Sequence, residues 1–481
     1  MKTETLERSH IKNTTGTSIV GSPNLKFVIA GVSMSLFMIN LDISIVSVGL
    51  PTMIESLKTT FASAQWFVLA YLLVLTATIT AAGRIGDLVG KRKLYLAGIA
   101  IFTMASLFCG VVDSATLFIL FRGLQGLGAA LILALSMAIA TEMTPKSRLG
   151  RIMGVLSAIT AFGIASGPTI GGLLLSAFGW RSMFLVNIPF GIIAFGLGYK
   201  HISSPASKKT VGIDWVGVVL LAITLSAYCI TMTMIEKRGM NNSFTLTFLT
   251  VSVIGLFAFI RFERRIKHPL IDVAIFKNKL ISKNLITTVL VYTVIITTII
   301  LPPFYLSKGA NYSLAQVGLI MSFGPLLTVA LSIYAGKIAD KYGAKNVMFY
   351  ALITMAIGCF CMSSVKPTGN IVGYLWRIGI IALGLNFFKT PNNTVVMEAA
   401  PADQRGLLSG FLSLSRILGQ ITGTTAMGVI FAVLSGVSNI SKMNSSGQSI
   451  TYGFDKVFLI NGFIALLAAL LIYPASFKQK V

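Results

Sequence analysis

Apolar runs of about 20 residues recur along the whole chain, and short polar segments separate them. About 20 residues is the length that a helix needs to cross the hydrocarbon core of a bilayer. Only 11% of the residues are charged and the mean hydropathy is +0.83, whereas a soluble protein carries about 25% charged residues. We therefore expect an all-α polytopic membrane protein with 14 transmembrane helices, near residues 27–48, 64–82, 93–112, 116–138, 152–175, 182–199, 214–234, 244–260, 284–306, 313–335, 347–364, 371–388, 407–433 and 457–477.

The distribution of basic residues predicts the side of the membrane that each loop faces. The formal net charge of +24 would suggest a nucleic-acid partner in a soluble protein. When the loops are assigned to alternate sides, 28 Lys and Arg fall on the side of the N-terminus and 8 on the other side. The positive-inside rule then places both termini in the cytoplasm. We expect a multi-pass protein of a bacterial plasma membrane, whose basic loops also attract anionic lipid, and no nucleic-acid partner.

Several kinds of chemistry are not indicated. The cysteines at 109, 229, 359 and 361 fall within predicted spans, so we expect buried thiols and no metal site. Residues 1–25 form a polar cytoplasmic tail without an apolar core, so no cleavable signal peptide is expected. No G-x-x-x-x-G-K-[ST] motif occurs, and the longest loops are too short for a nucleotide-binding domain. We expect neither an enzyme nor a cofactor, and an ion gradient must supply the work of any transport.

Two short polar loops repeat the pattern G-x-x-x-D-x-x-G between apolar helices. The first runs from Gly83 to Lys93 and the second from Gly336 to Asn346. Any cytoplasmic loop of a membrane protein collects Lys and Arg, but two copies in matching places indicate a common role. We interpret both as gating loops, in which the candidate residues are Gly83, Arg84, Asp87, Gly90 and Arg92 in the first copy and Gly336, Asp340 and Gly343 in the second.

Asp42 is the only acidic residue that we expect deep inside a span. It precedes Pro51 on the first span by roughly 13 Å at 1.5 Å per residue. Burying a carboxylate costs several kcal/mol unless it is paired or neutral, which indicates a functional group. Arg122 lies roughly 9 Å from the outer end of the fourth span, so the two side chains can pair or compete for one proton. A structural Asp bonded to neighbouring helices, and a structural Arg bonded to carbonyls, are the alternatives.

The fifth span combines closely spaced glycines with a proline. Glycines one turn apart allow close helix packing, and a proline bends a helix because it interrupts the hydrogen-bond ladder. This composition suits a pivot between two halves, although simple tight packing explains it equally well. The residues are Gly163, Gly167, Pro168, Gly171 and Gly172.

Together these segments resemble the motifs of the major facilitator superfamily. The resemblance rests on the loop at 83–93, Arg122-Gly123-Leu124-Gln125-Gly126, the segment 163–172 and Leu41-Asp42…Leu50-Pro51. It extends to Trp180-Arg181…Asn187-Ile188-Pro189 and Asp214-Trp215-Val216-Gly217, and with 14 spans the chain is similar to the 14-helix drug:proton antiporter branch.

The resemblance implies two pseudo-symmetric six-helix bundles with an inserted helix pair between them. We place the first bundle at 26–200, the inserted pair with its linkers at 201–283 and the second bundle at 284–478. Internal echoes support the repeat, since Glu142-x-x-Pro145 after the fourth span is matched by Glu398-x-x-Pro401 after the twelfth, and Arg122 by Arg377. Glu142 and Glu398 are inner-gate candidates. Six polar or aromatic residues are candidates for a substrate cavity: Asn40, Trp66, Tyr71, Gln125, Asn386 and Arg416.

We hypothesise a monomeric proton-coupled antiporter that exports hydrophobic or cationic drugs, antiseptics or antibiotics. In this hypothesis Asp42 binds a proton from outside and the substrate from inside in alternation, because burial disfavours its charged form and Arg122 favours it. One rival is a transporter of a physiological solute, such as an amino acid, an osmolyte or a siderophore. A membrane sensor or lipid scramblase is a third alternative. The acid within the membrane, the proline-containing fifth span and the two gating loops argue against it.

Overall fold

A computed structural model describes residues 23–202, 214–266, 277–365, 370–399, 405–436 and 447–473. Within these ranges the chain is helical, and 14 helical segments are long and apolar enough to cross a membrane. The prediction of an all-α membrane protein with 14 transmembrane helices is therefore confirmed. We call the side on which α1 begins the inner side, and the side on which it ends the outer side.

The helices of the first half and of the inserted pair follow one another with short connections. They are α1 (Pro23–Ser56), α2 (Phe61–Val89), α3 (Lys91–Val111), α4 (Ala115–Met143), α5 (Leu149–Phe178), the short α6 (Ser182–Leu185), α7 (Asn187–His201), α8 (Trp215–Arg238) and α9 (Ser243–Glu263).

The second half repeats this order with two helices interrupted by π-helical turns. They are α10 (Lys279–Ile300), α11 (Pro302–Phe304) with the turn Tyr305–Gly309, α12 (Leu314–Tyr342), α13 (Ala344–Met362), α14 (Ile371–Glu398), α15 (Arg405–Thr422) with the turn Gly423–Met427, α16 (Gly428–Ser435) and α17 (Gly447–Ile472).

Local sequence explains where several of these helices begin. Thr60 caps α2 by accepting from the Ser63 backbone N–H, and Ser313 forms a reciprocal capping box with Gln316 at the start of α12. The turns that join α2 to α3 and α12 to α13 each contain one residue at positive φ. Gly90 has φ 105° and Gly343 has φ 82°, a region that side chains rarely tolerate, so the last glycine of each gating loop is required by the backbone.

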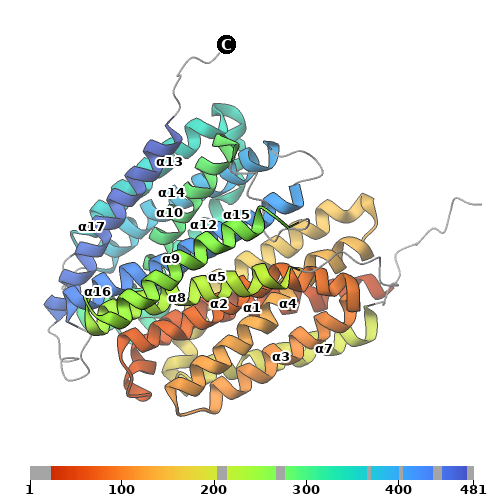
Figure 1. The fold of residues 1–481 in the computed structure, drawn as a ribbon, viewed down its shortest axis with the longest axis horizontal. Helices are drawn as coiled ribbons and strands as arrows, with labels where there is room; N and C mark the ends of the chain where they lie inside the picture. The colour runs from red at the N-terminus through yellow and green to blue at the C-terminus, as the bar shows by residue number, and fades with distance from the viewer. Residues whose placement is uncertain are drawn as a thin grey trace, which may run out of the picture.

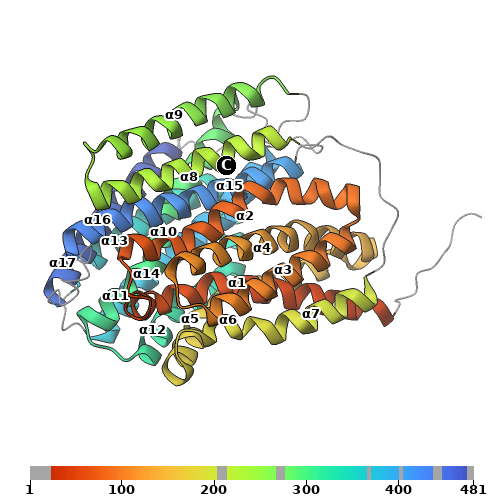
Figure 2. The same ribbon diagram turned by 60° about the horizontal axis from the view of Figure 1, so that its bottom comes forward.

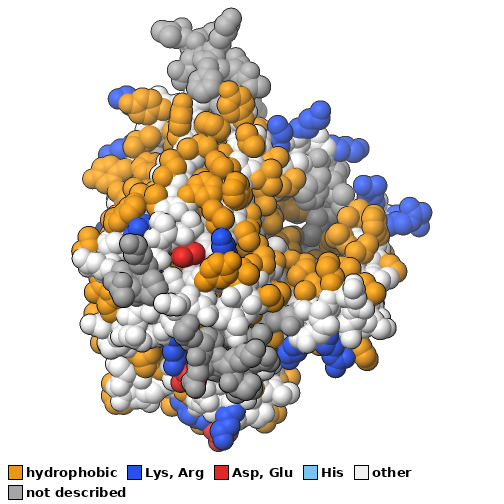
Figure 3. Space-filling model, turned by 90° about the vertical axis from the view of Figure 1, so that its left-hand side faces the viewer, with side chains coloured by type: hydrophobic (Ala, Val, Ile, Leu, Met, Phe, Trp, Pro, Cys, Tyr) orange, Lys and Arg blue, Asp and Glu red, His pale blue; other side chains and the backbone are white. Residues whose placement is uncertain are grey.

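The inserted pair lies beside the bundles (Figure 2). α8 packs against α2 and against α16, and its buried residues Val218, Leu221 and Leu225 belong to the apolar core of the first half. α9 packs on α8 and is exposed along most of its length, with Phe257 69% exposed. Exposed apolar side chains of this size are expected where a helix faces lipid. Broad apolar areas are also visible on the face that includes the turn between α8 and α9 (Figure 3).

The two halves meet on the outer side and diverge toward the inner side. α5 packs along α12, where Thr169 Oγ1 lies 2.6 Å from Ser322 Oγ, and Lys308 Nζ lies 2.5 Å from Glu55 Oε1. Phe61 of α2 contacts Phe304 and Phe431 of the second half, with ring centroids 5.2 and 5.7 Å away. In Figure 1 the first-half helices run almost horizontally, whereas α13, α14 and α17 rise steeply from the same lower left region. The structure is therefore inward-facing.

Candidate functional site

A fully buried ion pair lies inside the first half. Asp42 of α1 is 0% exposed and Arg122 of α4 is 1% exposed. Arg122 Nη1 donates to Asp42 Oδ2 over 2.6 Å. Counting residues along the first and fourth spans placed these two side chains at similar depths in the membrane. The structure shows that they are in direct contact.

Two amides complete the coordination of the Asp42 carboxylate. Gln125 Nε2 donates to Asp42 Oδ1 over 3.0 Å, and Asn187 Nδ2 of α7 donates to the same oxygen over 2.9 Å. Ser106 of α3 accepts from Gln125 Nε2 over 2.7 Å. Side chains from α1, α3, α4 and α7 therefore form one buried cluster, which we call the Asp42 cluster.

Arg122 has further partners that do not depend on Asp42. Its Nε donates to the backbone oxygen of Phe67 over 2.7 Å, and its Nη1 also donates to Gln125 Oε1 over 2.5 Å. The guanidinium carbon lies 4.7 Å from the centre of the Tyr71 ring, a favourable cation–π distance. Protonation of Asp42 would consequently leave Arg122 with three favourable contacts.

This geometry suits proton exchange at Asp42. A buried carboxylate is tolerated as an anion only while a cation and hydrogen-bond donors compensate its charge. Here one guanidinium and two amides do so, and a small displacement of Arg122 toward Phe67 and Tyr71 would favour the neutral acid instead. No group of three His, Cys, Asp or Glu side chains that could hold a metal ion occurs among the described residues.

A separate cavity lies between the two halves. It has a volume of about 210 Å³ and is lined from α1, α5, α10, α12, α14 and α15. Its lining is mainly apolar, and among the described residues the polar or charged lining side chains are Ser44, Tyr292, Thr298, Thr328, Tyr374, Lys389 and Gln420. We call it the central cavity.

None of the six side chains predicted to line a substrate cavity lines the central cavity in this conformation, and their part in substrate binding stays a prediction. Tyr71 and Gln125 belong to or border the Asp42 cluster, and Asn40 Nδ2 donates to the backbone oxygen of Leu36 over 2.7 Å. Trp66 donates from Nε1 to Thr233 Oγ1 of α8 over 3.0 Å.

Asn386 and Arg416 lie directly behind the lining. Asn386 donates from Nδ2 to the backbone oxygen of Thr328 over 2.8 Å. Arg416 donates from Nη2 to Asn393 Oδ1 over 2.8 Å and lies 6.0 Å from the centre of the Tyr292 ring. Thr328 and Tyr292 line the cavity in their place, because the rotation of each helix about its own axis decides which face reaches the cavity.

Asp42 itself does not line the central cavity, whereas Ser44, two residues further along α1, does. The hypothesis that Asp42 binds proton and substrate in alternation therefore stays a prediction, and in this conformation a substrate in the central cavity would not contact Asp42 directly. Asp42 faces the interior of its own half, where Arg122, Gln125 and Asn187 occupy both carboxylate oxygens.

The second half repeats part of the cluster with a threonine in place of the carboxylate. Asn461 of α17 occupies the place in the repeat that Asn187 has in the first half, since both follow a Phe by three residues. Asn461 Nδ2 donates to Thr297 Oγ1 of α10 over 2.6 Å, so a threonine accepts where Asp42 does in the first half. Arg377, the counterpart of Arg122, donates to the backbone oxygens of Cys361 and Gly373 over 2.9 and 2.7 Å.

Asp455 corrects the expectation that Asp42 is the only acid inside a span. It lies within α17, because that helix begins at Gly447, ten residues before the predicted span. Asp455 is half-buried on the outer part of the second half, and its Oδ1 atom has no hydrogen-bond partner.

The glycines of α5 pack against two different helices. A methyl group added at Gly167 would lie 1.8 Å from Ser44 Oγ, and Gly163 and Gly171 likewise contact α1. Gly172 instead faces Gly318 of α12, where an added methyl group would lie 2.9 Å from the Gly318 Cα atom. Pro168 lines the central cavity and its backbone oxygen lies against Gly318. α5 thus connects α1, α12 and the cavity.

The two gating loops differ in their contacts. In the first, Lys91 pairs with Asp87 over 3.1 Å and with Glu142 of α4, and Arg92 donates to the backbone oxygen of Tyr199 over 2.5 Å. These contacts remain within the first half.

The second loop has no equivalent ion pair. Asp340 is exposed and forms no ion pair with a described residue, and the same holds for Glu398. A methyl group at Gly83 or Gly336 would meet no atom within 4 Å, so neither first glycine is needed for close approach in this conformation. Pro401 lies outside the described residues.

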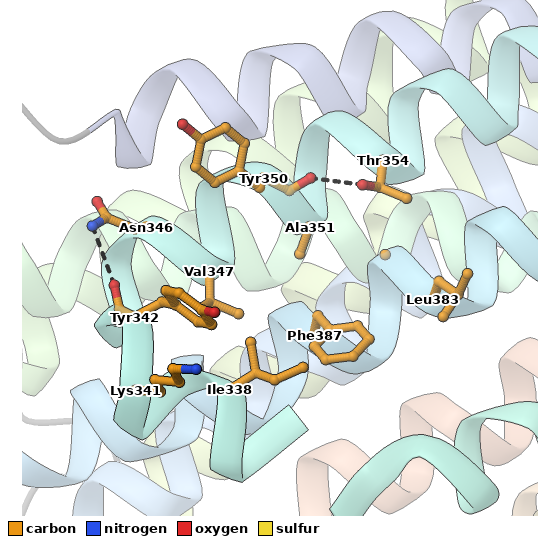
Figure 4. A pocket seen from close by; sticks show the side chains of 11 residues that line it. Ile338, Lys341, Tyr342, Asn346, Val347, Tyr350, Ala351, Thr354, Leu383 and Phe387 are labelled. Atoms are coloured by element: carbon orange, nitrogen blue, oxygen red, sulfur yellow. Dashed lines mark hydrogen bonds between the residues drawn. The ribbon is translucent and has the colours of Figure 1, made fainter. Parts of the chain in front are cut away.

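A second cavity of about 550 Å³ lies at the inner end of the second half. It is formed by α12, α13 and α14, and Lys341, Tyr342 and Asn346 of the second gating loop line it (Figure 4). Asn346 donates to the backbone oxygen of Tyr342 over 3.3 Å, which holds the loop against the start of α13.

Comparisons with known proteins agree with this fold. The family model described as Major Facilitator Superfamily matches residues 32–424 and 284–480. The riboflavin transporter RibZ of Clostridioides difficile is 32% identical over 402 residues, which cover 83% of this chain and 87% of RibZ. The multidrug resistance protein Stp of Mycobacterium tuberculosis is 28% identical over 401 residues, covering 83% of this chain and 74% of Stp.

Solved structures resemble the chain as well. The crystal structure of a bacterial homolog of the human lysosomal transporter Spinster, in an inward-facing and unoccupied conformation, superposes with a TM-score of 0.69. The sequence identity is 13%, and the match covers 94% of this chain and 96% of that one.

Proposed function

This chain belongs to the major facilitator superfamily, and on that premise we propose that it is a proton-coupled antiporter that exports amphipathic small molecules by alternating access. The observation that carries the proposal is the Asp42 cluster, a buried carboxylate held by Arg122, Gln125 and Asn187 in one half only. A structural ion pair alone would be expensive to bury, and replacing such a pair by apolar residues often costs no stability.

The cycle starts from the inward-facing state. A substrate enters the central cavity from the inner side while Asp42 is ionised and paired with Arg122. The halves then rock about the contact between α5 and α12, which opens the outer side. In that state Asp42 takes a proton from outside, Arg122 retains its bonds to Phe67 and Gln125, and the return step carries the proton inward.

α1 and α5 provide the connection between proton and substrate. Asp42 faces the cluster, and Ser44 faces the central cavity. Ser44 also packs tightly against Gly167 of α5. Because the two helices are in close contact there, a shift of α1 on protonation would displace α5 as well.

A second candidate is transport of a physiological aromatic solute by the same cycle. The relative RibZ is named a riboflavin transporter, and two tyrosines of the central cavity, Tyr292 and Tyr374, suit a planar ring system. Riboflavin and fluorescein, each added separately to the same preparation, separate this candidate from multidrug export, because a transporter dedicated to riboflavin would not move fluorescein.

The test uses inside-out membrane vesicles energised by a pH gradient. Addition of a transported compound should dissipate the gradient in vesicles that contain the wild-type chain. Asp42→Asn should abolish this dissipation while the purified protein remains folded. Asp113→Asn, the same substitution at an exposed outer acid paired with Arg181, is the matched control and should behave as wild type. Wild-type coupling in Asp42→Asn would refute the role of Asp42.

A further inference from the structure

The charge inside the central cavity is positive. Lys389 lines the cavity and is exposed, and among the described residues no Asp or Glu lines it. The apolar run of the twelfth span ends at Phe388, but α14 continues to Glu398, so Lys389 lies inside the helix. At 1.5 Å per residue it is roughly 13 Å along the axis from Glu398.

Lys389 has no counter-charge of its own. It forms no ion pair with any residue in the described part of the chain. Asp42 of the first half does not neutralise Lys389 either. It does not line the central cavity, and Arg122 and two amides donate to its carboxylate oxygens. Arg416 adds a second cation behind the Tyr292 ring.

The other polar groups of the lining are suited to the same kind of ligand. Tyr292, Tyr374 and Gln420 can each donate a hydrogen bond to an acceptor, whereas the Thr298 hydroxyl donates to the backbone oxygen of Ile295, and most of the remaining surface is aliphatic. The aromatic rings of Tyr292 and Tyr374 can stack on a planar ring. A lipophilic cation would find no carboxylate here and would be repelled by Lys389.

We propose that the central cavity selects amphipathic aromatic compounds whose polar end is anionic, with Lys389 as the residue that binds the negative charge. This inference rests on the proposed function, because it names the substrate class of the same site. It differs from the sequence-based expectation of hydrophobic or cationic drugs, antiseptics or antibiotics.

The proposal also gives substrate a role in the conformational change. In the inward-facing state water reaches Lys389 from the open inner side. Closing that side removes the water, and an uncompensated ammonium in an apolar cavity is costly. A bound anion neutralises the charge, so closure is favoured only when the substrate is present.

The experiment measures equilibrium binding to the purified full-length protein in detergent by fluorescence anisotropy. The probes are fluorescein, an anion at pH 7.5, and rhodamine 123, a cation built on the same xanthene ring system. Wild type should bind fluorescein more tightly than rhodamine 123. Lys389→Gln should weaken fluorescein binding about tenfold, the loss expected for one charge-assisted contact. Lys389→Glu should reverse the preference, and Lys389→Arg should keep it.

Lys283→Gln is the matched control, because Lys283 is an exposed lysine near the inner end of α10 and does not line the cavity. It should bind both dyes as wild type does. Unchanged fluorescein binding in Lys389→Gln, a wild-type preference for rhodamine 123, or no fluorescein binding by wild type would each overturn the inference. Proton coupling through Asp42 would stand in all three cases, since it is measured separately in vesicles.

Discussion

At the scale of single residues, the Asp42–Arg122 pair has a high desolvation cost, which its mutual attraction and its hydrogen bonds compensate. Each member is buried among helices of one half, and each has other polar partners at 2.5–3.0 Å. Removing one partner of a buried pair leaves an uncompensated charge and costs about 3–5 kcal/mol, whereas removing both costs far less. The two losses can therefore be separated by measurement.

We expect Arg122→Met to lower the thermal unfolding midpoint of the detergent-solubilised protein by several degrees, because Asp42 is left buried without a cation. The double variant Asp42→Asn with Arg122→Met should regain most of that stability but no proton coupling. Arg377→Met is the control, since Arg377 bonds to backbone carbonyls, and combining it with Asp42→Asn should bring no recovery. A double variant as unstable as Arg122→Met would show that the pair is not the source of the cost.

The sequence made the Asp42–Arg122 contact predictable but not the cluster around it. Both charges lie in apolar runs, so their depth follows from counting residues along a helix. Asn187 and Ser106 carry no such signal, because an amide or a hydroxyl within a span usually bonds its own helix. Their contribution depends on how α3 and α7 rotate toward α1, and a single sequence does not specify those rotations.

At the scale of elements, α5 is a helix that packs against helices of both halves. Gly163, Gly167 and Gly171 pack on α1, and Gly172 packs on α12. The sequence indicated a glycine-lined, proline-bent helix but did not show which partner each glycine faces. The pivot remains a prediction.

A substitution series along α5 tests this prediction. Gly167→Val should reduce transport more than tenfold, because even a methyl group there would lie 1.8 Å from Ser44 Oγ and α1 would have to move. Gly154→Val, on the same helix but with no neighbour within 4 Å of an added methyl group, is the matched control and should retain transport. Initial rates of substrate-driven proton movement in vesicles give the comparison. Equal rates in the two variants would contradict a role for the α1–α5 contact.

Helix ends explain the other differences between expectation and structure. Apolar runs identified all 14 spans, yet α14 and α17 extend beyond their runs and bring Lys389 and Asp455 inside the helices. A hydropathy pattern reports contact with lipid, whereas a helix face that points into a cavity can carry charge and continue as a helix.

At the scale of the whole molecule, the outer contacts hold the two halves in the inward-facing state. Thr169 of α5 and Ser322 of α12 lie with their hydroxyl oxygens 2.6 Å apart, across the interface that must open. Thr169→Cys with Ser322→Cys should therefore form a disulfide on mild oxidation and stop transport, and reduction should restore it. Either single cysteine variant, treated in the same way, is the control. Continued transport by the oxidised double variant would show that this interface does not open during the cycle.

The central claim is that substrate binding and the protonation of Asp42 exclude one another. The most direct measurement is proton release from the purified, detergent-solubilised protein when a bound compound, such as fluorescein, is added in weakly buffered solution. We predict that wild type releases protons on addition of the compound and that Asp42→Asn binds the compound without release. Equal release from both proteins would contradict the account.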